Sequence, residues 1–240
     1  MIGLLLRCIL FVFLGSIPLS SAEIYPYQVE NVFIVDNFED KNVSKQPKWW
    51  AFGDIDVFIE ENKTVDVVGI EQFSMAIKGK RRTPKMVGGV GTFLGVDLAP
   101  YNALKLMIYG RGRHSGILMI ELFDDDSNDF EVTSHPFDPS QIIHDDKFTY
   151  HFPITWEGWK VVIIQLDSFK DANPLFGDNV FNPFQTDTSG GLLQLQLLLF
   201  ATDQKKNPRI SIDTIKFFNT ANIKDETLDN QYYFSEDDFY

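Results

Sequence analysis

The chain has 240 residues, of which 44% are hydrophobic and 14% aromatic, so it can fill the core of one large β domain or of two small ones. Its formal net charge is −13, and an acidic surface repels the phosphate backbone of nucleic acids. The densest basic stretch is the turn "KGKRRTPK" at residues 78–85, which reads as a solvated loop. We therefore expect no nucleic-acid partner.

The first residues have the pattern of a secretory signal peptide. Arg7 precedes a short apolar run, and the small residues Ser20 and Ala22 have the spacing that signal peptidase prefers. The run is shorter than the roughly 20 apolar residues that a membrane span needs. We predict a signal peptide over residues 1–22, a secreted or periplasmic protein, and no membrane span after cleavage; the alternative is an uncleaved anchor. The only cysteine, Cys8, lies in this segment, so the mature chain would have no disulfide.

Strand signals then follow one another along the chain. Short runs rich in β-branched and aromatic residues alternate with turn-rich stretches, and sustained helical periodicity is absent from the sequence. This pattern is typical of an all-β antiparallel β-sandwich or jelly roll, and we predict one such domain over residues 23–221. The candidate strands are 32–38, 55–60, 73–78, 91–96, 103–109, 116–123, 148–152, 160–166, 192–200 and 210–218.

The last residues, 222–240, differ in character. They are acidic, include five aromatic residues and lack periodicity. We interpret them as a poorly ordered tail, with a docking peptide as the alternative.

Alternation along four strands predicts which side chains face the core. The predicted core stripe consists of Leu104, Leu106, Ile108, Leu118, Ile120, Leu122, Phe148, Tyr150, Phe152, Leu193, Leu195, Leu197 and Leu199. The opposite side is semi-polar without being highly charged, which suits a shallow ligand-binding face. Its members are Tyr109, Glu121, His151, Gln194 and Gln196.

The segment "WEGWKVVIIQLDSF" at residues 156–169 reads as a structural strand. Val162, Ile164 and Leu166 share its core side, and nothing in it is nucleophilic. Trp156 precedes Gly158 and is expected in a loop, free to face solvent and to serve a ligand.

Four motifs in order carry a family resemblance: "VDNFED" (35–40), "LKLMIYGRG" (104–112), "WKVVIIQLDSF" (159–169) and "ISIDTIKFF" (210–218). Together they resemble the galactose-binding-like β-sandwich. Within that group the chain is similar to family-11 carbohydrate-binding modules and to the complex I intermediate-associated protein 30 family. The resemblance spans residues 32–218 and supports the fold more than the function, because one sandwich hosts several functions.

The resemblance implies a non-catalytic binding protein whose ligand is a carbohydrate, an oligo- or polysaccharide. Sugar recognition combines an aromatic platform with amides and carboxylates for the hydroxyl groups. We predict Tyr109, His151 and Trp156 as platform residues and Glu121, Gln194 and Gln196 as hydrogen-bonding residues. The alternative is a protein–protein assembly module of the complex I-associated type. A glycoside hydrolase is the less favoured reading, because it needs two carboxylates across a cleft.

A structural calcium ion is also expected. The first and last strands of this sandwich lie near each other, and the resembled domains often carry such an ion. Asp36 and Glu39 end the first strand, and Asp213 lies in the last, so their hard oxygen ligands would clamp the chain ends around Ca²⁺. Alternatively, Asp213 caps a turn or remains solvated.

Three other sequence features do not match the known binding motifs that they partly resemble. "DDDSNDFE" at residues 124–131 has Asp129 where an EF-hand needs glycine and His135 where it needs glutamate, so it reads as a polar hairpin turn. "GGVGTFLG" at residues 88–95 lacks the Gly-Lys-Ser/Thr of a phosphate loop and reads as a flexible strand edge. The four histidines show no zinc spacing.

Overall fold

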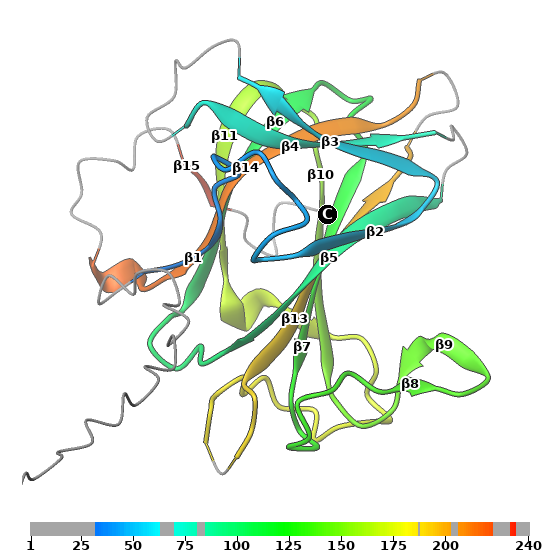
Figure 1. Cartoon of the computed structure of the whole chain (residues 1–240), viewed down its shortest axis with the longest axis vertical. Coiled ribbons are helices and arrows are strands. Elements are labelled where there is room, and N and C mark those ends of the chain that lie inside the picture. The colour runs from blue at the N-terminus through cyan, green and yellow to red at the C-terminus, as the bar shows by residue number, and fades with distance from the viewer. Residues whose placement is uncertain are drawn as a thin grey trace, which may run out of the picture.

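The computed structural model describes residues 32–62, 70–80, 85–186, 188–202, 206–222 and 231–233. Two β-sheets pack face to face around a hydrophobic core (Figure 1). All pairings between the described strands are antiparallel except one, that between β11 and β15. The predicted all-β antiparallel sandwich is confirmed.

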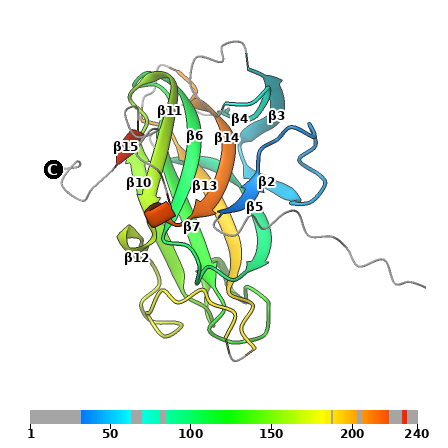
Figure 2. The same ribbon diagram turned by 90° about the vertical axis from the view of Figure 1, so that its left-hand side faces the viewer.

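The first sheet has seven strands in the order β15-β11-β6-β14-β4-β3, with β1 also paired to β14 (Figure 2). Strand β14 therefore pairs with three other strands. The bounds are β1 Val32–Asp36, β3 Ile55–Glu61, β4 Phe73–Gly79, β6 Ala103–Arg111, β11 Glu157–Gln165, β14 Arg209–Phe218 and β15 Gln231–Tyr233.

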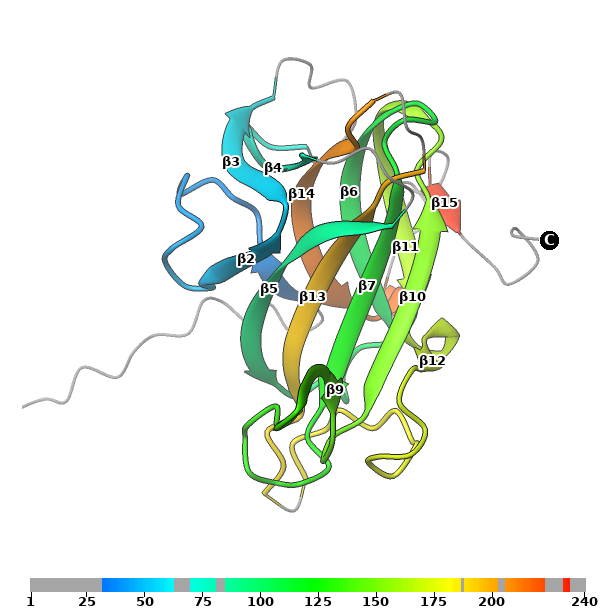
Figure 3. The same cartoon turned by 90° about the vertical axis from the view of Figure 1, so that its right-hand side faces the viewer.

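The second sheet has six strands in the order β12-β10-β7-β13-β5-β2 and faces the viewer in Figure 3. Its bounds are β2 Trp49–Gly53, β5 Met86–Val96, β7 Ile117–Asp124, β10 Lys147–Pro153, β12 Lys170–Asp171 and β13 Leu192–Phe200. A small hairpin, β8 (Ser134–His135) with β9 (Asp138–Ile142), projects from one end. Two short 3₁₀ turns, η1 (Leu166–Ser168) and η2 (Thr220–Asn222), complete the described elements.

The core lies between the sheets, where the alternation predicted it. With one exception, the predicted core side chains of β6, β7, β10 and β13 belong to the inter-sheet cluster. The exception is Leu193, which is buried outside that cluster. The register of β13 shifts between Leu192 and Gln194, and such a bulge reverses the alternation locally. Leu192 consequently takes the core position.

The stretch at residues 156–169 is structural, as expected, except at its first residue. Val162, Ile164 and Leu166 lie in the core cluster. Trp156 does too: it is only 8% exposed, and its Nε1 donates a hydrogen bond to the backbone oxygen of Ile108 at 3.2 Å. The prediction of a solvent-facing Trp156 is wrong, because the indole fills the space between the sheets and finds its hydrogen-bond partner there.

The structure describes part of the predicted C-terminal tail but none of the predicted signal peptide. The predicted signal peptide, residues 1–22, lies outside the described residues and stays a prediction. Within the predicted tail, Gln231–Tyr233 forms β15 and pairs in parallel with Val161–Ile163 of β11. That part of the tail is a strand, in contrast to the expected irregular extension. No helix in the described part of the chain is long and apolar enough to span a membrane.

Candidate functional site

The side of the six-stranded sheet that faces away from the core is the candidate binding surface, here called the outer face. Strand pairing aligns its residues in three rows across the sheet. The first row is Trp50, Gly91, Gln196, Glu121 and Thr149. The second row is Phe52, Gly89, Leu198, Met119 and His151. The third row is Phe93, Gln194, Phe123 and Lys147.

Two aromatic rings lie on the glycines of the neighbouring strand. A Cβ atom added to Gly91 would lie 2.5 Å from the indole of Trp50, and one added to Gly89 would lie 2.8 Å from the ring of Phe52. Both rings therefore rest on bare backbone of β5, where any larger residue would displace them. Both side chains remain partly exposed, so together they form an aromatic platform on the β2 side of the outer face.

Polar groups continue the first row beyond the platform. Gln196 is partly exposed and lies between Gly91 and Glu121 in the register. The Glu121 carboxylate lies 3.7 Å from the Nζ atom of Lys147. Burial raises the pKa of Glu121, and the positive charge of Lys147 partly opposes that rise. The first row thus offers an amide and a carboxylate beside aromatic rings.

Four of the six predicted ligand-binding residues lie on this surface. Glu121 and Gln196 are neighbours in the first row, His151 ends the second row, and Gln194 lies in the third. His151 is exposed, whereas Gln194 is 7% exposed. Their assignment to one face is confirmed by the register, and their role in binding stays a prediction.

Tyr109 lies on a different surface, so its predicted place beside these residues is wrong. It belongs to β6 in the seven-stranded sheet, where its ring meets Trp159 edge-on at 5.4 Å and Arg111 covers it at 5.0 Å. Alternation shows which side of a strand faces away from the core, but a sandwich has two outward faces. Trp156, buried between the sheets, is the second predicted residue that does not lie on the outer face.

The predicted binding face did not include the platform; the region around Trp50 was only an alternative position for the site. Trp50 and Phe52 lie in β2, which was not among the predicted strands. The alternation in "WWAFG", with Trp49 in the core cluster and Trp50 outside it, was an available signal. Phe93, which is 49% exposed, was also missed.

The predicted calcium ligands do not assemble into one site. Asp36 accepts hydrogen bonds from the backbone N–H of Phe38 and from Nε1 of Trp49. A carboxylate oxygen of Glu39 accepts from the backbone N–H of Phe73 at 2.7 Å. Asp213 accepts from the backbone N–H of Glu71 at 2.9 Å, and burial raises its pKa to about 6. Each carboxylate thus satisfies separate protein donors, and the ligand assignment is corrected accordingly.

A different carboxylate group has the spacing for a metal ion. Among the described residues, Asp124, Asp126 and Asp146 each place one oxygen within 4.8 Å of the others. Burial, with mutual repulsion of the carboxylates, raises the pKa of Asp124 to about 8 and that of Asp146 to about 7. Burial, with repulsion from Asp178 and Asp145, raises the pKa of Asp126 to about 6. These residues could hold a cation, which would neutralise them.

Comparisons with known proteins find structural similarity without sequence similarity. No family model and no curated protein sequence matches the chain. The chain is similar in structure to a family 11 carbohydrate-binding module from Clostridium thermocellum in complex with a beta-1,3-1,4-mixed-linked tetrasaccharide. The identity is 14% and the TM-score 0.46, over 79% of this chain and 96% of that one.

Two further solved structures are similar. One is the family 30 carbohydrate-binding module of the Clostridium thermocellum cellulosomal cellulase Cel9D-Cel44B, with 15% identity and a TM-score of 0.43 over 72% of this chain and 92% of that one. The other is an exo-beta-agarase, with 10% identity and a TM-score of 0.49 over 82% of this chain and 26% of that one. The predicted structural resemblance to family 11 modules is confirmed. The likeness to the complex I intermediate-associated family stays a prediction.

Proposed function

We propose that this protein binds a carbohydrate chain on the outer face of the six-stranded sheet, without catalysis. The observation that carries the proposal is the pair of aromatic rings, Trp50 and Phe52, lying on Gly91 and Gly89 beside a polar row. A pyranose ring has an apolar side that stacks on an aromatic surface and hydroxyl groups at its rim.

The polar groups of the first row suit those hydroxyls. The amide of Gln196 both donates and accepts hydrogen bonds, and the ionised carboxylate of Glu121 accepts them. Adjacent strands are about 4.8 Å apart, so the five residues of the first row extend over about 19 Å. This length favours an oligosaccharide lying across the strands over a single sugar.

The composition of the three rows favours binding over hydrolysis. Glu121 is the only carboxylate in them, whereas the usual glycosidase mechanism uses two carboxylates on either side of the bond. We therefore infer a binding role in which the sugar is left intact.

The test begins with a glycan array probed with the purified protein, followed by calorimetric titration of soluble oligosaccharides. A beta-1,3-1,4-mixed-linked tetrasaccharide is a suitable first ligand. Trp50→Ala removes the platform and should weaken binding by roughly tenfold to a hundredfold, because the transfer free energy of a buried aromatic side chain is about 1.5–3 kcal/mol. Gln196→Ala should weaken it less, by about 1 kcal/mol, since a neutral hydrogen bond is largely exchanged with water.

Leu195→Ala is the matched control for stability. Leu195 precedes Gln196 on β13 but lies fully buried in the core. The variant should lower the free energy of unfolding by about 2–5 kcal/mol, whereas Trp50→Ala should lower it much less. Undiminished sugar affinity in Trp50→Ala would show that the outer face is not the site, and a lack of binding to any glycan would refute the function.

A second candidate function is docking to another protein. Phe93 and Met86 of β5 are 49% and 45% exposed, and both point to the outer face, so this surface also carries exposed apolar area. Self-association in sedimentation, removed by Phe93→Ser and accompanied by no glycan binding, would favour this function.

We also propose that the protein is secreted or periplasmic. The support is the sequence of residues 1–22, with one basic residue, a short apolar run and a small-residue cleavage pattern. Amino-terminal sequencing of the exported protein should find a start near Glu23; retention of Met1 would contradict cleavage.

A further inference from the structure

Three aspartates converge at one end of the six-stranded sheet. Asp124 is the last residue of β7, Asp126 lies two residues later, and Asp146 immediately precedes β10. One oxygen of each lies within 4.8 Å of the others. Two calcium ligands, each about 2.4 Å from the ion, lie at most about 4.8 Å apart, so the spacing fits a shared calcium ion.

Two of these carboxylates have an oxygen without a hydrogen-bond partner. The Oδ2 atoms of Asp124 and Asp146 accept hydrogen bonds from the backbone N–H groups of Asn182 and Val180. Their Oδ1 atoms have no partner, although Asp124 is 1% exposed and Asp146 is 0% exposed. A buried carboxylate oxygen without a partner is costly, because it loses water and gains nothing in return. These two oxygens are therefore the ones that a ligand would satisfy.

The loop that covers the aspartates approaches two of them closely at Gly177. A Cβ atom on Gly177 would lie 2.0 Å from Oδ1 of Asp146 and 2.5 Å from Oδ2 of Asp126, so a larger residue would collide with both carboxylates. The φ angle of Gly177 is +67°, a conformation that also favours glycine. The unpartnered oxygen of Asp146 thus lies close to the backbone of Gly177, where only glycine fits.

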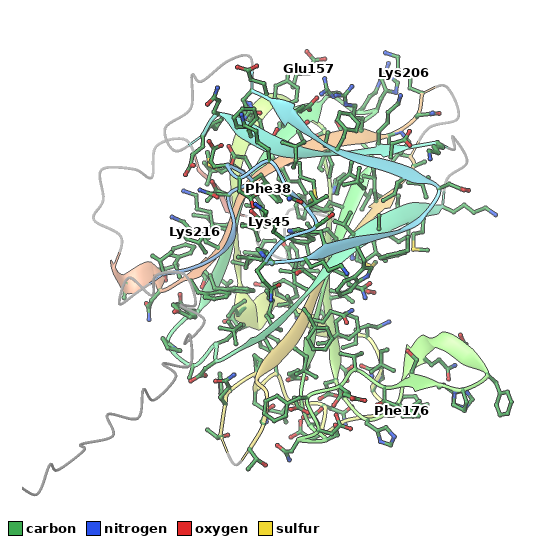
Figure 4. The ribbon with its side chains drawn as sticks, in the orientation of Figure 1. Phe38, Lys45, Glu157, Phe176, Lys206 and Lys216 are labelled. Carbon is green, nitrogen blue, oxygen red and sulfur yellow. The ribbon has the colours of Figure 1, made fainter. Side chains whose placement is uncertain are left out.

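A surface cavity reaches one member of this group, Asp126, together with Gly177. It is lined by Asp126, Ile143, His144, Leu175, Phe176, Gly177 and Asp178. Figure 4 labels Phe176 among the loops at this end of the molecule, at the opposite end from Glu157 and Lys206.

We propose that Asp124, Asp126 and Asp146 form a calcium site that joins the three loops at this end of the sandwich. All three offer hard oxygen ligands and none offers nitrogen or sulfur, which favours calcium over zinc. Water and backbone carbonyls would complete the six to eight oxygen ligands that calcium takes. The site is independent of the proposed sugar binding.

The loops joined here come from distant parts of the chain. Asp124 ends β7 and Asp126 lies in the loop that follows, Asp146 lies in the loop before β10, and Val180 and Asn182 lie in the loop between β12 and β13. Asp146 also donates its backbone N–H to Asp126 at 2.9 Å. An ion at this point would neutralise mutually repelling carboxylates and fix the ends of β7 and β10.

The experiment is thermal unfolding of the full mature chain in calcium and in chelator, with a calorimetric titration of calcium alone. At a hundredfold excess over the dissociation constant, mass action should raise Tm by about 5–10 °C. Magnesium at the same concentration is the control ion and should raise it less, because it demands a small octahedral site.

The variants Asp124→Asn and Asp146→Asn keep an oxygen for the backbone N–H groups of Asn182 and Val180. In chelator each should melt at or above the wild-type temperature, since one of several repelling carboxylates is gone. In calcium each should lose most of the rise in Tm. Asp213→Asn, which changes a buried aspartate outside the cluster, should retain the full rise.

Equal melting in calcium and chelator, with no heat of binding, would overturn the proposal. So would loss of the calcium effect in Asp213→Asn while Asp124→Asn and Asp146→Asn retain it, because that result would place the ion at the chain ends.

Discussion

Trp156, which immediately precedes β11, and Tyr109 of the neighbouring strand β6 show how differently two aromatic residues can serve the fold. Trp156 stacks on Phe152 with ring centroids 6.4 Å apart and lies in the inter-sheet core. Tyr109 contacts Trp159 on the outward side of the other sheet. Replacement by alanine should therefore have different effects at the two positions.

We predict that Trp156→Ala lowers the free energy of unfolding by about 3–5 kcal/mol, because it leaves a cavity in the core and removes the hydrogen bond to the backbone oxygen of Ile108. Tyr109→Ala should cost about 0.5–1.5 kcal/mol for the lost aromatic pair, in addition to its buried area. Neither residue lies on the outer face, so the intrinsic sugar affinity of the folded protein should not change. Denaturant unfolding measures the free energy of unfolding, and calorimetry measures the sugar affinity. A loss of affinity in folded Tyr109→Ala would show that the sugar binds on the seven-stranded sheet.

Lys105 is a partly buried cation that makes stability depend on pH. Burial, with repulsion from Lys216, lowers its pKa from 10.5 to about 8. Between pH 8 and 10.5 the unfolded chain therefore binds more protons at this residue than the folded chain does. The free energy of unfolding contributed by this residue consequently rises as pH rises through that window.

We predict that Lys105→Met is more stable than the wild type at pH 7 and that this advantage shrinks as pH rises from 8 to 10. Urea unfolding across this pH range checks the prediction, with the exposed Lys78→Met as control. An advantage that stays constant with pH would show that it comes from packing and not from the charge.

At the scale of elements, the outer face depends on the fit between β2 and β5. The rings of Trp50 and Phe52 lie on β5 because Gly91 and Gly89 carry no side chain. The stretch "GGVGTFLG" was expected as a flexible edge, yet β5 pairs with β13 on one side and with β2 on the other. Gly89 and Gly91 of this strand leave the space that the rings of Phe52 and Trp50 occupy.

We predict that Gly91→Ala weakens sugar binding, approaching the effect of Trp50→Ala, because the added methyl group displaces the indole. The fold should persist, since the collision at Gly91 is with a side chain and not with backbone. Calorimetry and the tryptophan fluorescence spectrum report the two effects. Unchanged binding together with a shifted spectrum would mean that the position of Trp50 does not matter to the ligand.

The two sites differ in how far sequence could predict them. Alternation within a strand correctly placed Glu121, His151, Gln194 and Gln196 on one face, because side-chain direction is a local property. The platform was missed because Trp50 depends on a glycine that lies about forty residues later and pairs with it only in the folded sheet. Local sequence does not contain that pairing.

The cluster of Asp124, Asp126 and Asp146 could not be predicted from local sequence either, because its members meet only in the folded chain. The acidic stretch at residues 124–131 was noticed as failing the EF-hand pattern, but Asp146, which joins two of its aspartates, comes from another loop. The chain-end calcium site failed because nearness of two strands does not decide where carboxylates point. Asp36 and Asp213 are directed to different N–H donors.

At the scale of the whole molecule, fold class was the most predictable property. Many short alternating strands separated by turns allow few architectures other than a sandwich, and the structure has two packed sheets. The membership of each strand in one sheet or the other was not predictable, since both sheets expose a semi-polar face. That ambiguity led to the error at Tyr109.

The positions of β13 and β14 have a consequence for how the protein is made. β14 joins β1, β4 and β6, while β13 lies between β5 and β7, and both are synthesised after all of these partners. At about 5–20 residues per second, β1 waits on the order of 10–40 s for its partner to be synthesised. During that time apolar strands with unpaired edges are exposed. We expect the nascent chain to remain unfolded until residue 218 has emerged and to depend on chaperones until then.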